Sequence, residues 1–549
     1  MMDSTDQLYQ DFLTEMDSLE RFRQRYQRNH PSVPIDRDDP DVRRLMESMA
    51  FFSVQTRQAT LHNLRSTWLR LFSSFFDFLL EPLPAAAMVQ AVPTEKMVEA
   101  VVLPRGTELR LTPTDGVAGS FRLQRDLHIL PIFLEDSSVV RLANGGHRLI
   151  LRFASAHPRK DPVGLFSLHV RHLDDYRSSL AVYHALSKHL EQVSVVYDQT
   201  ADERTVGTRC EHTFGRDRPA PEDGTEYAHP VQRVRAFFQM PEQGLFLHVQ
   251  VAPTRQAWTR FSLCLDLKKE WTVGRSPHPD ILHPCVVPVV NLKAEPAQPL
   301  TVDGTRSEFP ILGLSAGRDF RLQSVTGVYQ LTQTGREPLR PAYLPGDGPS
   351  YEIDEELAED LSPRQRLLVR MPEAFDEPRK VLVEALWYQP RFASQASGRI
   401  EVSTPSRHVE GLRWQMVGGL QPHRDSPLRN DVAALTQVLS WKVKSTLERN
   451  ELIALLSYLG TPVEGPFRAI IPWIRKTKVS VLPDGALRGT GLRHLYEMQL
   501  EPFDSSAEPL VVCLLEQVKE LLDAWNGEAT VELRPSMAGG GPISPRVSP

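Results

Sequence analysis

The histidines are the residues whose spacing most directly tests for metal chemistry. The chain has 17 of them, and two that share a helix or strand face can bind a metal ion. His169 and His172 are three residues apart, which places them on opposite faces of a strand. His184 and His189 are five apart and do not share a helical face well, and neither pair has a nearby carboxylate at a metal-site spacing. We therefore expect no metal site.

An acidic run and a tripeptide are similar to known functional motifs. Residues 36–41 carry the carboxylates of a calcium loop but lack the central glycine and the distant glutamate that such a loop requires. Negative charge at a helix N-terminus explains the same residues. His278-Pro279-Asp280 is the tripeptide that joins two helices in J-domain co-chaperones, but here it lies in a proline-rich region where we expect strands. We assign a function to neither.

Motifs of catalysis and cofactor binding are missing from the sequence. It contains no Gly-x-Ser-x-Gly elbow, phosphate loop or dinucleotide fingerprint. A sequence cannot show two carboxylates facing each other across a cleft, so a β-rich glycosidase stays open. The widely spaced Cys210, Cys264, Cys285 and Cys513 are typical of reduced, buried thiols. We predict no enzyme activity, no catalytic, cofactor-binding or metal-binding residue, and no cofactor.

Size, charge and hydropathy exclude further classes of protein. The chain has 549 residues, of which 41% are hydrophobic and 24% charged, a composition typical of globular proteins and too apolar for a disordered one. A net charge of -6 gives no reason to expect nucleic acid as a partner. Residues 1–10 lack the apolar core of a signal peptide, and no apolar run reaches the roughly 20 residues that span a bilayer. We predict a cytoplasmic protein with no direct membrane insertion.

The first 80 or so residues carry the pattern of helices. Apolar side chains recur there at steps of three and four, which places them on one helical face. Asp39 is a plausible N-cap, with Pro40 at the first helical position. The first stripe consists of Leu8, Phe12, Met16, Leu19, Phe22 and Tyr26. The second starts after Asp41 and continues through Leu61, Leu64, Trp68, Leu71, Phe72, Phe75, Phe76 and Leu79. A core and a subunit interface explain the second, aromatic stripe equally well.

After Pro82 and Pro84 the apolar period changes to two. Alternation over 108–112, 149–153, 166–170 and 261–267 indicates half-buried strands of antiparallel sheets. One helical stretch, 179–190, interrupts them. We predict an α+β fold in which a helical N-terminal region precedes several antiparallel β-sandwich or barrel-like domains and a mixed α/β C-terminal region. The predicted division is helical 1–84, β-rich 85–275 with one inserted helix, β-rich and proline-rich 276–425, mixed α/β 426–536 and a disordered tail 537–549.

Several blocks, in order along the chain, carry a family resemblance. They are DPDVRRLMESMAFF at 39–52, PRGTEL at 104–109, LAVYHAL at 180–186, FFQMPE at 237–242, CVVPVVNL at 285–292, TRSEFP at 305–310 and SVTGV at 324–328. This ordered set resembles the TssF family, a baseplate subunit of the bacterial type VI secretion system, over about the first two-thirds of the chain. The last third departs more. Residues 413–417 and 488–490 are similar to family landmarks, but GGLQ at 418–421 is not, and the usual end segment is missing after Trp525.

The resemblance implies a structural role in a contractile machine. It implies that two copies of the chain assemble with one TssG-like subunit into a wedge that docks onto TssK. Six wedges then surround the VgrG spike, with TssE, the tail tube and the sheath as further partners. The baseplate initiates tube and sheath assembly, and the protein would reach the inner face of the cell envelope through it.

The aromatic stripe suits such an assembly on physical grounds. Trp68, Phe72, Phe75 and Phe76 are natural anchors because large apolar rings dominate many protein interfaces. Two alternatives remain. One is a baseplate protein of a related contractile phage tail or extracellular injection system, and the other is a β-rich carbohydrate-binding or carbohydrate-active protein.

Overall fold

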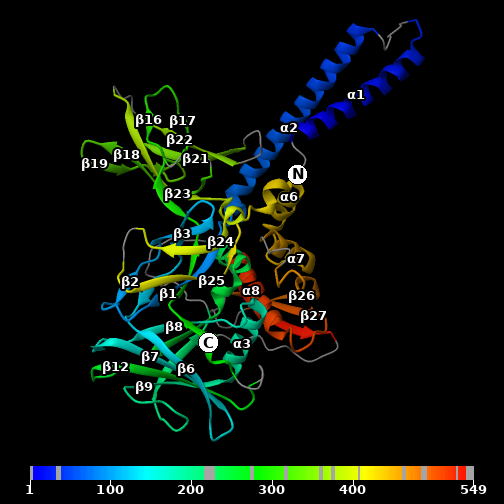
Figure 1. Cartoon of the computed structure of the whole chain (residues 1–549). Helices are drawn as coiled ribbons and strands as arrows, with labels where there is room; N and C mark the ends of the chain where they lie inside the picture. Colours follow the sequence, from blue (N-terminus) through cyan, green and yellow to red (C-terminus); the bar gives the residue numbers. More distant parts are fainter. Residues whose placement is uncertain are drawn as a thin grey trace.

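The molecule consists of stacked β-sheets flanked by helices, from which a long helical hairpin projects (Figure 1). The structure, a computed structural model, describes residues 4–32, 39–215, 229–271, 277–314, 319–357, 363–371, 377–405, 409–459, 465–483, 491–526 and 529–538. The predicted tail and the landmark at 488–490 therefore lie outside the described residues, apart from residues 537 and 538.

The hairpin is formed by α1 (Ser4–Asn29) and α2 (Pro40–Leu80). Helix α2 begins as predicted, because the Asp39 side chain accepts a hydrogen bond from the Asp41 amide at 2.9 Å and Pro40 occupies the first turn. We call α1 together with residues 40–64 the arm, and residues 65–81 the base. The arm is the blue pair of helices that leaves the body in Figure 1.

A six-stranded sheet at the centre joins distant parts of the sequence. Strand β1 lies between β14 and β25, with Met88 opposite both Pro288 and Val417. The sheet therefore takes strands from both sides of the predicted boundary at 275/276, and the division into domains stays a prediction. Its order is β24 (Ser397–Ser403), β3 (Glu108–Asp115), β4 (Gly119–Leu123), β14 (Val286–Val290), β1 (Ala86–Pro93) and β25 (Leu412–Gln421), with β2 (Val101–Leu103), β5 (Leu127–Ile129) and α5 (Phe392–Gln395) beside it.

An eight-stranded sheet lies below the central one in Figure 1. Its order is β13 (Leu282–Pro284), β8 (Gly164–Val170), β11 (Phe246–Val251), β10 (Thr208–Phe214), β9 (Leu190–Tyr197), β12 (Trp258–Leu267), β7 (His147–Arg159) and β6 (Phe133–Arg141). The four strand segments predicted from alternation fall in β3, β7, β8 and β12, which confirms them. The predicted helix at 179–190 is α3 (Tyr176–His189).

The C-terminal region packs on that sheet and shares its core. It contains η3 (Pro427–Asn430), α6 (Val432–Trp441), α7 (Arg449–Tyr458), η4 (Ile471–Trp473), β26 (Ile474–Pro483), β27 (Leu492–Leu500), α8 (Glu508–Asn526) and β28 (Ala529–Met537). The largest apolar cluster unites α8, α3 and α4 (Pro230–Gln239) with the inner face of the eight-stranded sheet and the base. The short η1 (Pro241–Gly244) and η2 (Pro279–Ile281) connect these layers.

A separate β-structure is inserted between β14 and α5. We call residues 293–388 the inserted module. It contains one sheet of β15 (Lys293–Pro296), β16 (Leu300–Val302), β18 (Arg321–Thr332), β19 (Gly335–Pro338) and β23 (Arg379–Tyr388), and another of β17 (Glu308–Pro310), β20 (Arg340–Pro341), β21 (Ser350–Leu357) and β22 (Pro363–Arg370). The predicted α+β class with curled, mainly antiparallel sheets is confirmed. Among the described helices, none combines the length and apolar character needed to cross a membrane.

Candidate functional site

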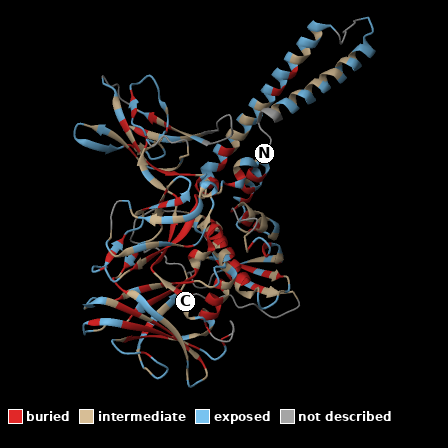
Figure 2. Cartoon of the chain, in the orientation of Figure 1, coloured by how far each residue is buried: buried red, intermediate tan, exposed pale blue. Residues whose placement is uncertain are grey.

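The arm is a two-helix structure with very little core of its own. Within its described side chains only Ala50 and Val54 are buried, and Figure 2 shows the arm mostly in the exposed and intermediate colours. Polar contacts supplement this seam: Arg57 pairs with Asp11 at 3.3 Å, and the Ser53 hydroxyl donates to Glu15 at 3.1 Å. Two helices in contact along one line leave most of their surface uncovered, so apolar residues outside the seam face solvent.

The charges along the arm explain its antiparallel register. Residues 4–20 of α1 carry only acidic charges and residues 21–29 only arginines, an order that the helix dipole favours. Residues 48–76 of α2 carry Arg57, Arg65 and Arg70 and no acidic residue. The antiparallel turn therefore places the acidic start of α1 against a basic part of α2.

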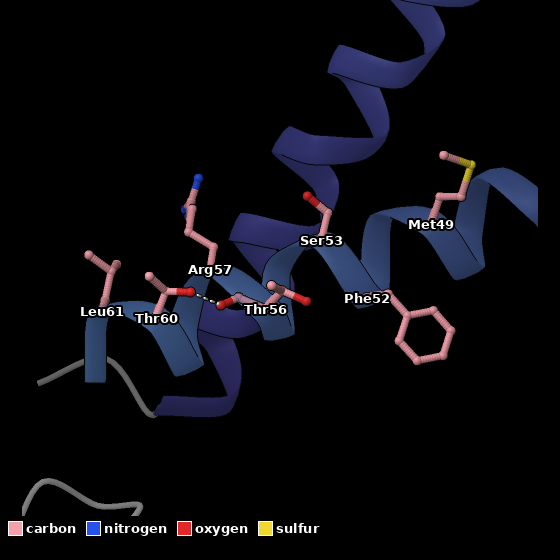
Figure 3. Close-up of a pocket in the computed structure, with 7 residues that line it drawn as sticks. All are labelled: Met49, Phe52, Ser53, Thr56, Arg57, Thr60 and Leu61. Atoms are coloured by element: carbon pink, nitrogen blue, oxygen red, sulfur yellow. Dashed lines mark hydrogen bonds between the residues drawn. The ribbon is translucent and has the colours of Figure 1, made fainter. Parts of the chain in front are cut away.

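The outer face of the arm is apolar and uncovered. Leu45, Met49 and Phe52 follow one another at steps of four and three, and they are 62%, 53% and 64% exposed. An open groove of about 620 Å³ begins at Met49 and Phe52 and continues along α2 to Thr60 (Figure 3). Exposed apolar side chains also lie on the partner helix, at Tyr9, Leu13 and Phe22. The spacing of residues 45, 49 and 52 was a signal in the sequence. The predicted stripe starts after Asp41, but the residues named for it run only from Leu61 to Leu79.

The predicted aromatic anchors divide between core and surface. Phe72 and Phe76 are buried within the main core, and the Phe76 ring stacks on Trp525 with centroids 5.4 Å apart. The interpretation of these two rings as interface anchors is therefore wrong, because neighbouring segments of the same chain already enclose them. Phe75 is exposed and lies under Lys442, whose Nζ is 3.2 Å from the ring centroid, and Trp68 is half-buried.

Arginines from distant segments bind the C-terminal end of α2. The last carbonyls of a helix lack intrahelical partners. Arg235 on α4, almost fully buried, donates to the carbonyl oxygens of Phe78 and, at 2.6 Å, Glu81. Arg429 on η3 donates to the Leu80 carbonyl at 2.9 Å. Burial lowers the pKa of Arg235 to about 10, so the side chain remains charged at neutral pH. These contacts fix the direction in which the arm leaves the body.

The candidate metal residues do not converge. His169 is buried on β8, where its Nε2 lies 3.1 Å from the Glu242 carbonyl oxygen, and burial lowers its pKa to about 3. His172 lies beyond the end of β8, and His184 has its Nε2 4.0 Å from a Glu508 carboxylate oxygen. In the described ranges, no three His, Cys, Asp or Glu side chains are grouped to hold a metal ion. The four cysteines are buried and free, and burial raises the pKa of Cys285 to about 12.

The comparisons with known proteins identify the class of this fold. One chain of a type VI secretion system TssK-TssF-TssG baseplate subcomplex, determined by cryo-electron microscopy, matches with a TM-score of 0.71 and 16% identity, over 92% of this chain and 99% of that chain. A chain of the baseplate complex from the type VI secretion system matches with a TM-score of 0.60 and 14% identity, over 98% of both chains. No curated protein matches. The fold is therefore one found in type VI secretion baseplates.

The family follows from the sequence itself. The family model described as "Type VI secretion system, TssF" matches residues 1–356, and the chain belongs to this family. The predicted resemblance and the role as a type VI secretion baseplate subunit are confirmed. The family and the matched complexes are structural parts of a secretion machine, which sets them apart from the phage-tail and carbohydrate alternatives.

Proposed function

We propose that this protein is a non-enzymatic wedge subunit that joins a TssG-like protein and TssK in the baseplate and uses its arm as a docking element. Two copies bind one TssG-like subunit, and the wedges surround the VgrG spike beneath TssE, the tube and the sheath. The protein acts in the cytoplasm, at the inner face of the envelope. Family membership and the fold shared with a chain of a TssK-TssF-TssG subcomplex support this proposal.

The observation that carries the proposal is the uncovered apolar face of the arm. Burying a Leu, Met or Phe side chain completely contributes about 1.5–3 kcal/mol. Leu45, Met49 and Phe52 lie on one face of α2, well before its break at Phe76, where another helix can pack along them. A partner that adds a helix here completes a bundle that α1 and α2 leave open, and burial of these partly exposed side chains offsets part of the entropic cost of association.

Co-expression with the TssG-like protein of the same gene neighbourhood tests the proposal. The complex is isolated by size-exclusion chromatography and its mass measured. We expect two copies of this chain per partner for the wild type. Phe52→Glu places a charge in the docking face and should weaken the complex at least about tenfold. Val206→Glu, at a 94% exposed apolar residue between β9 and β10, is the matched control and should leave assembly unchanged.

Two results would overturn the proposal in different ways. If the wild-type chain ignores the TssG-like protein, the wedge role fails. If the wild type assembles but Phe52→Glu assembles equally well, the wedge role survives and the arm is not the docking element.

A further inference from the structure

The inserted module is connected to the rest of the protein by two adjacent stretches of chain. The chain enters it after Asn291 and leaves it at Gln389. The Asn291 side chain, 1% exposed, accepts a hydrogen bond from the Gln389 amide at 2.6 Å and donates to the Gln389 side chain at 3.2 Å. It also donates to the Ser120 carbonyl, on β4 of the central sheet, at 2.9 Å. We call the two adjacent chain connections at Asn291 and Gln389 the crossing.

The module has a hydrophobic core that is separate from the others. The buried members of this core all come from the module, from Ala297 on one side to Trp387 on the other. None of the module's described apolar residues belongs to the clusters that hold the central sheet or the eight-stranded sheet. An element with its own core and two adjacent chain connections can rotate without breaking another core.

Away from the crossing, ion pairs hold the module to the base and to η3. Asp354 on β21 accepts from Arg70 at 2.6 Å, and the next residue, Glu355, pairs with both terminal nitrogens of Arg429, one of them at 3.1 Å. We call these two pairs the clasp. Figure 1 shows β21 reaching toward α2 from the side of the module. Other contacts lie near the crossing, among them a hydrogen bond from Gln323 to the Pro82 carbonyl and the stacking of Tyr388 on His423.

The clasp and the crossing differ in how easily they can open. The Arg70 and Asp354 side chains are 58% and 31% exposed, so water and salt compete for them. Arg429 and Glu355 are 13% and 26% exposed, so salt screens their pair less. Asn291 and Gln389 are buried, and breaking their hydrogen bonds leaves polar groups without partners. The contacts of the clasp therefore open more readily than those of the crossing.

We propose that the inserted module is a hinged element that turns about the Asn291–Gln389 crossing when the clasp releases it from the base. Because Arg429 also donates to the Leu80 carbonyl, opening of the clasp changes the contacts at the C-terminal end of α2. A partner that covers Asp354 and Glu355, or that draws the arm away, shifts the module between a clasped and a released position.

Distance measurements between two spin labels test the hinge in the isolated chain. Thr334→Cys in the β18–β19 turn labels the module, and Val443→Cys, at a 92% exposed residue after α6, labels the body. The four native cysteines are buried, which directs labelling to the new sites. We expect Asp354→Arg/Glu355→Arg to broaden the distance distribution about twofold. Adding Arg70→Asp should narrow it again, because one ion pair returns with reversed charges.

Two further measurements separate release of the clasp from a folding defect of the variant. Arg336→Glu breaks an ion pair of similar exposure that lies wholly within the module, with Glu384, and should leave the distances unchanged. Salt at about 1 M should broaden the distribution of the wild type without any clasp mutation. Distances that respond neither to salt nor to Asp354→Arg/Glu355→Arg would overturn the hinge, whether or not the chain binds a TssG-like partner.

Discussion

The outer part of α2, residues 40–64, and the base belong to the same helix and contain similar apolar residues, but they lie in opposite surroundings. In the outer part of α2, Ala50 and Val54 are buried and Phe52 faces solvent. In the base, Phe72, Phe76 and Leu79 are buried in the main core, to which α4, α6 and α8 also contribute. The comparison teaches that an apolar helical stripe predicts a face that will be buried. It does not tell whether the same chain or a partner covers that face. The following experiments test how far this difference extends.

The largest effect is expected in the base. Phe72→Ala removes a fully buried ring that contacts Phe76 with centroids 5.3 Å apart, and it should lower the free energy of unfolding by about 3–5 kcal/mol. Urea denaturation measures the loss. Phe75→Ala is the control. Phe75 lies nearly one helical turn further along and is exposed, so its removal should lower the free energy of unfolding by less than about 1 kcal/mol. Equal losses for the two variants would remove the distinction between buried and exposed rings in this region.

Removing the arginine that binds the end of α2 should have the next largest effect. Arg235→Met keeps most of the side-chain volume but leaves the Phe78 and Glu81 carbonyls without their donor. We expect a loss of about 2–3 kcal/mol, since each buried unpaired polar group costs about 1–3 kcal/mol and removal of a buried charge offsets part of it. Arg233→Met on the same helix, at an exposed residue, is the matched control. A loss no larger than that of the control would show that Arg235 does not support the base.

Acid should destabilise the body before it affects the arm. The folded protein binds a proton at His169 only near pH 3, whereas the unfolded chain binds it near pH 6.5. Between these values the unfolded state holds more protons, so stability falls as the pH drops, by up to about 1.4 kcal/mol per unit. Unfolding measured from pH 7 to 5 should show a smaller decrease for His169→Gln than for the wild type. Parallel curves for the two proteins would contradict a buried, neutral His169.

The smallest effect on stability is expected on the outer face of the arm. Phe52→Ser should change the free energy of unfolding of the isolated chain by no more than about 0.5 kcal/mol, because the ring is already exposed. The same denaturation experiment measures it. A loss comparable to that of Phe72→Ala would mean that the arm packs against this chain in solution.

Local features of the fold could be predicted from the sequence because their causes are local. Asp39 and Pro40 mark the start of α2 since an N-cap and a proline act on the turn that contains them. Alternation at 261–267 locates β12 because one face of a strand is buried along its whole length. The family blocks extended the prediction to the baseplate, and the strongest of them, 285–292, contains β14 and the hinge residue Asn291.

The long-range arrangement could not be predicted in the same way. The pairing of β1 with β14 and β25 joins residues about 200 and 330 positions apart, and no short-range pattern specifies the partner of a strand. The burial of Phe72 depends on the main core, to which α8 contributes. Phe52 is exposed because no described part of the chain covers it. The candidate surface thus required the tertiary structure, although the spacing of its residues was present in the sequence.

The break in α2 at Phe76 has a mechanical consequence. This residue leaves the helical conformation, with φ -141° and ψ 41°, close to the arginines that bind the helix end. The 36 residues from there to Pro40 rise about 54 Å at about 1.5 Å each. A rotation of roughly 10° at this point would carry the tip of the arm through about 9 Å, close to the distance between two packed helices. Small rearrangements at the root are thereby amplified into displacements large enough to exchange one neighbour for another.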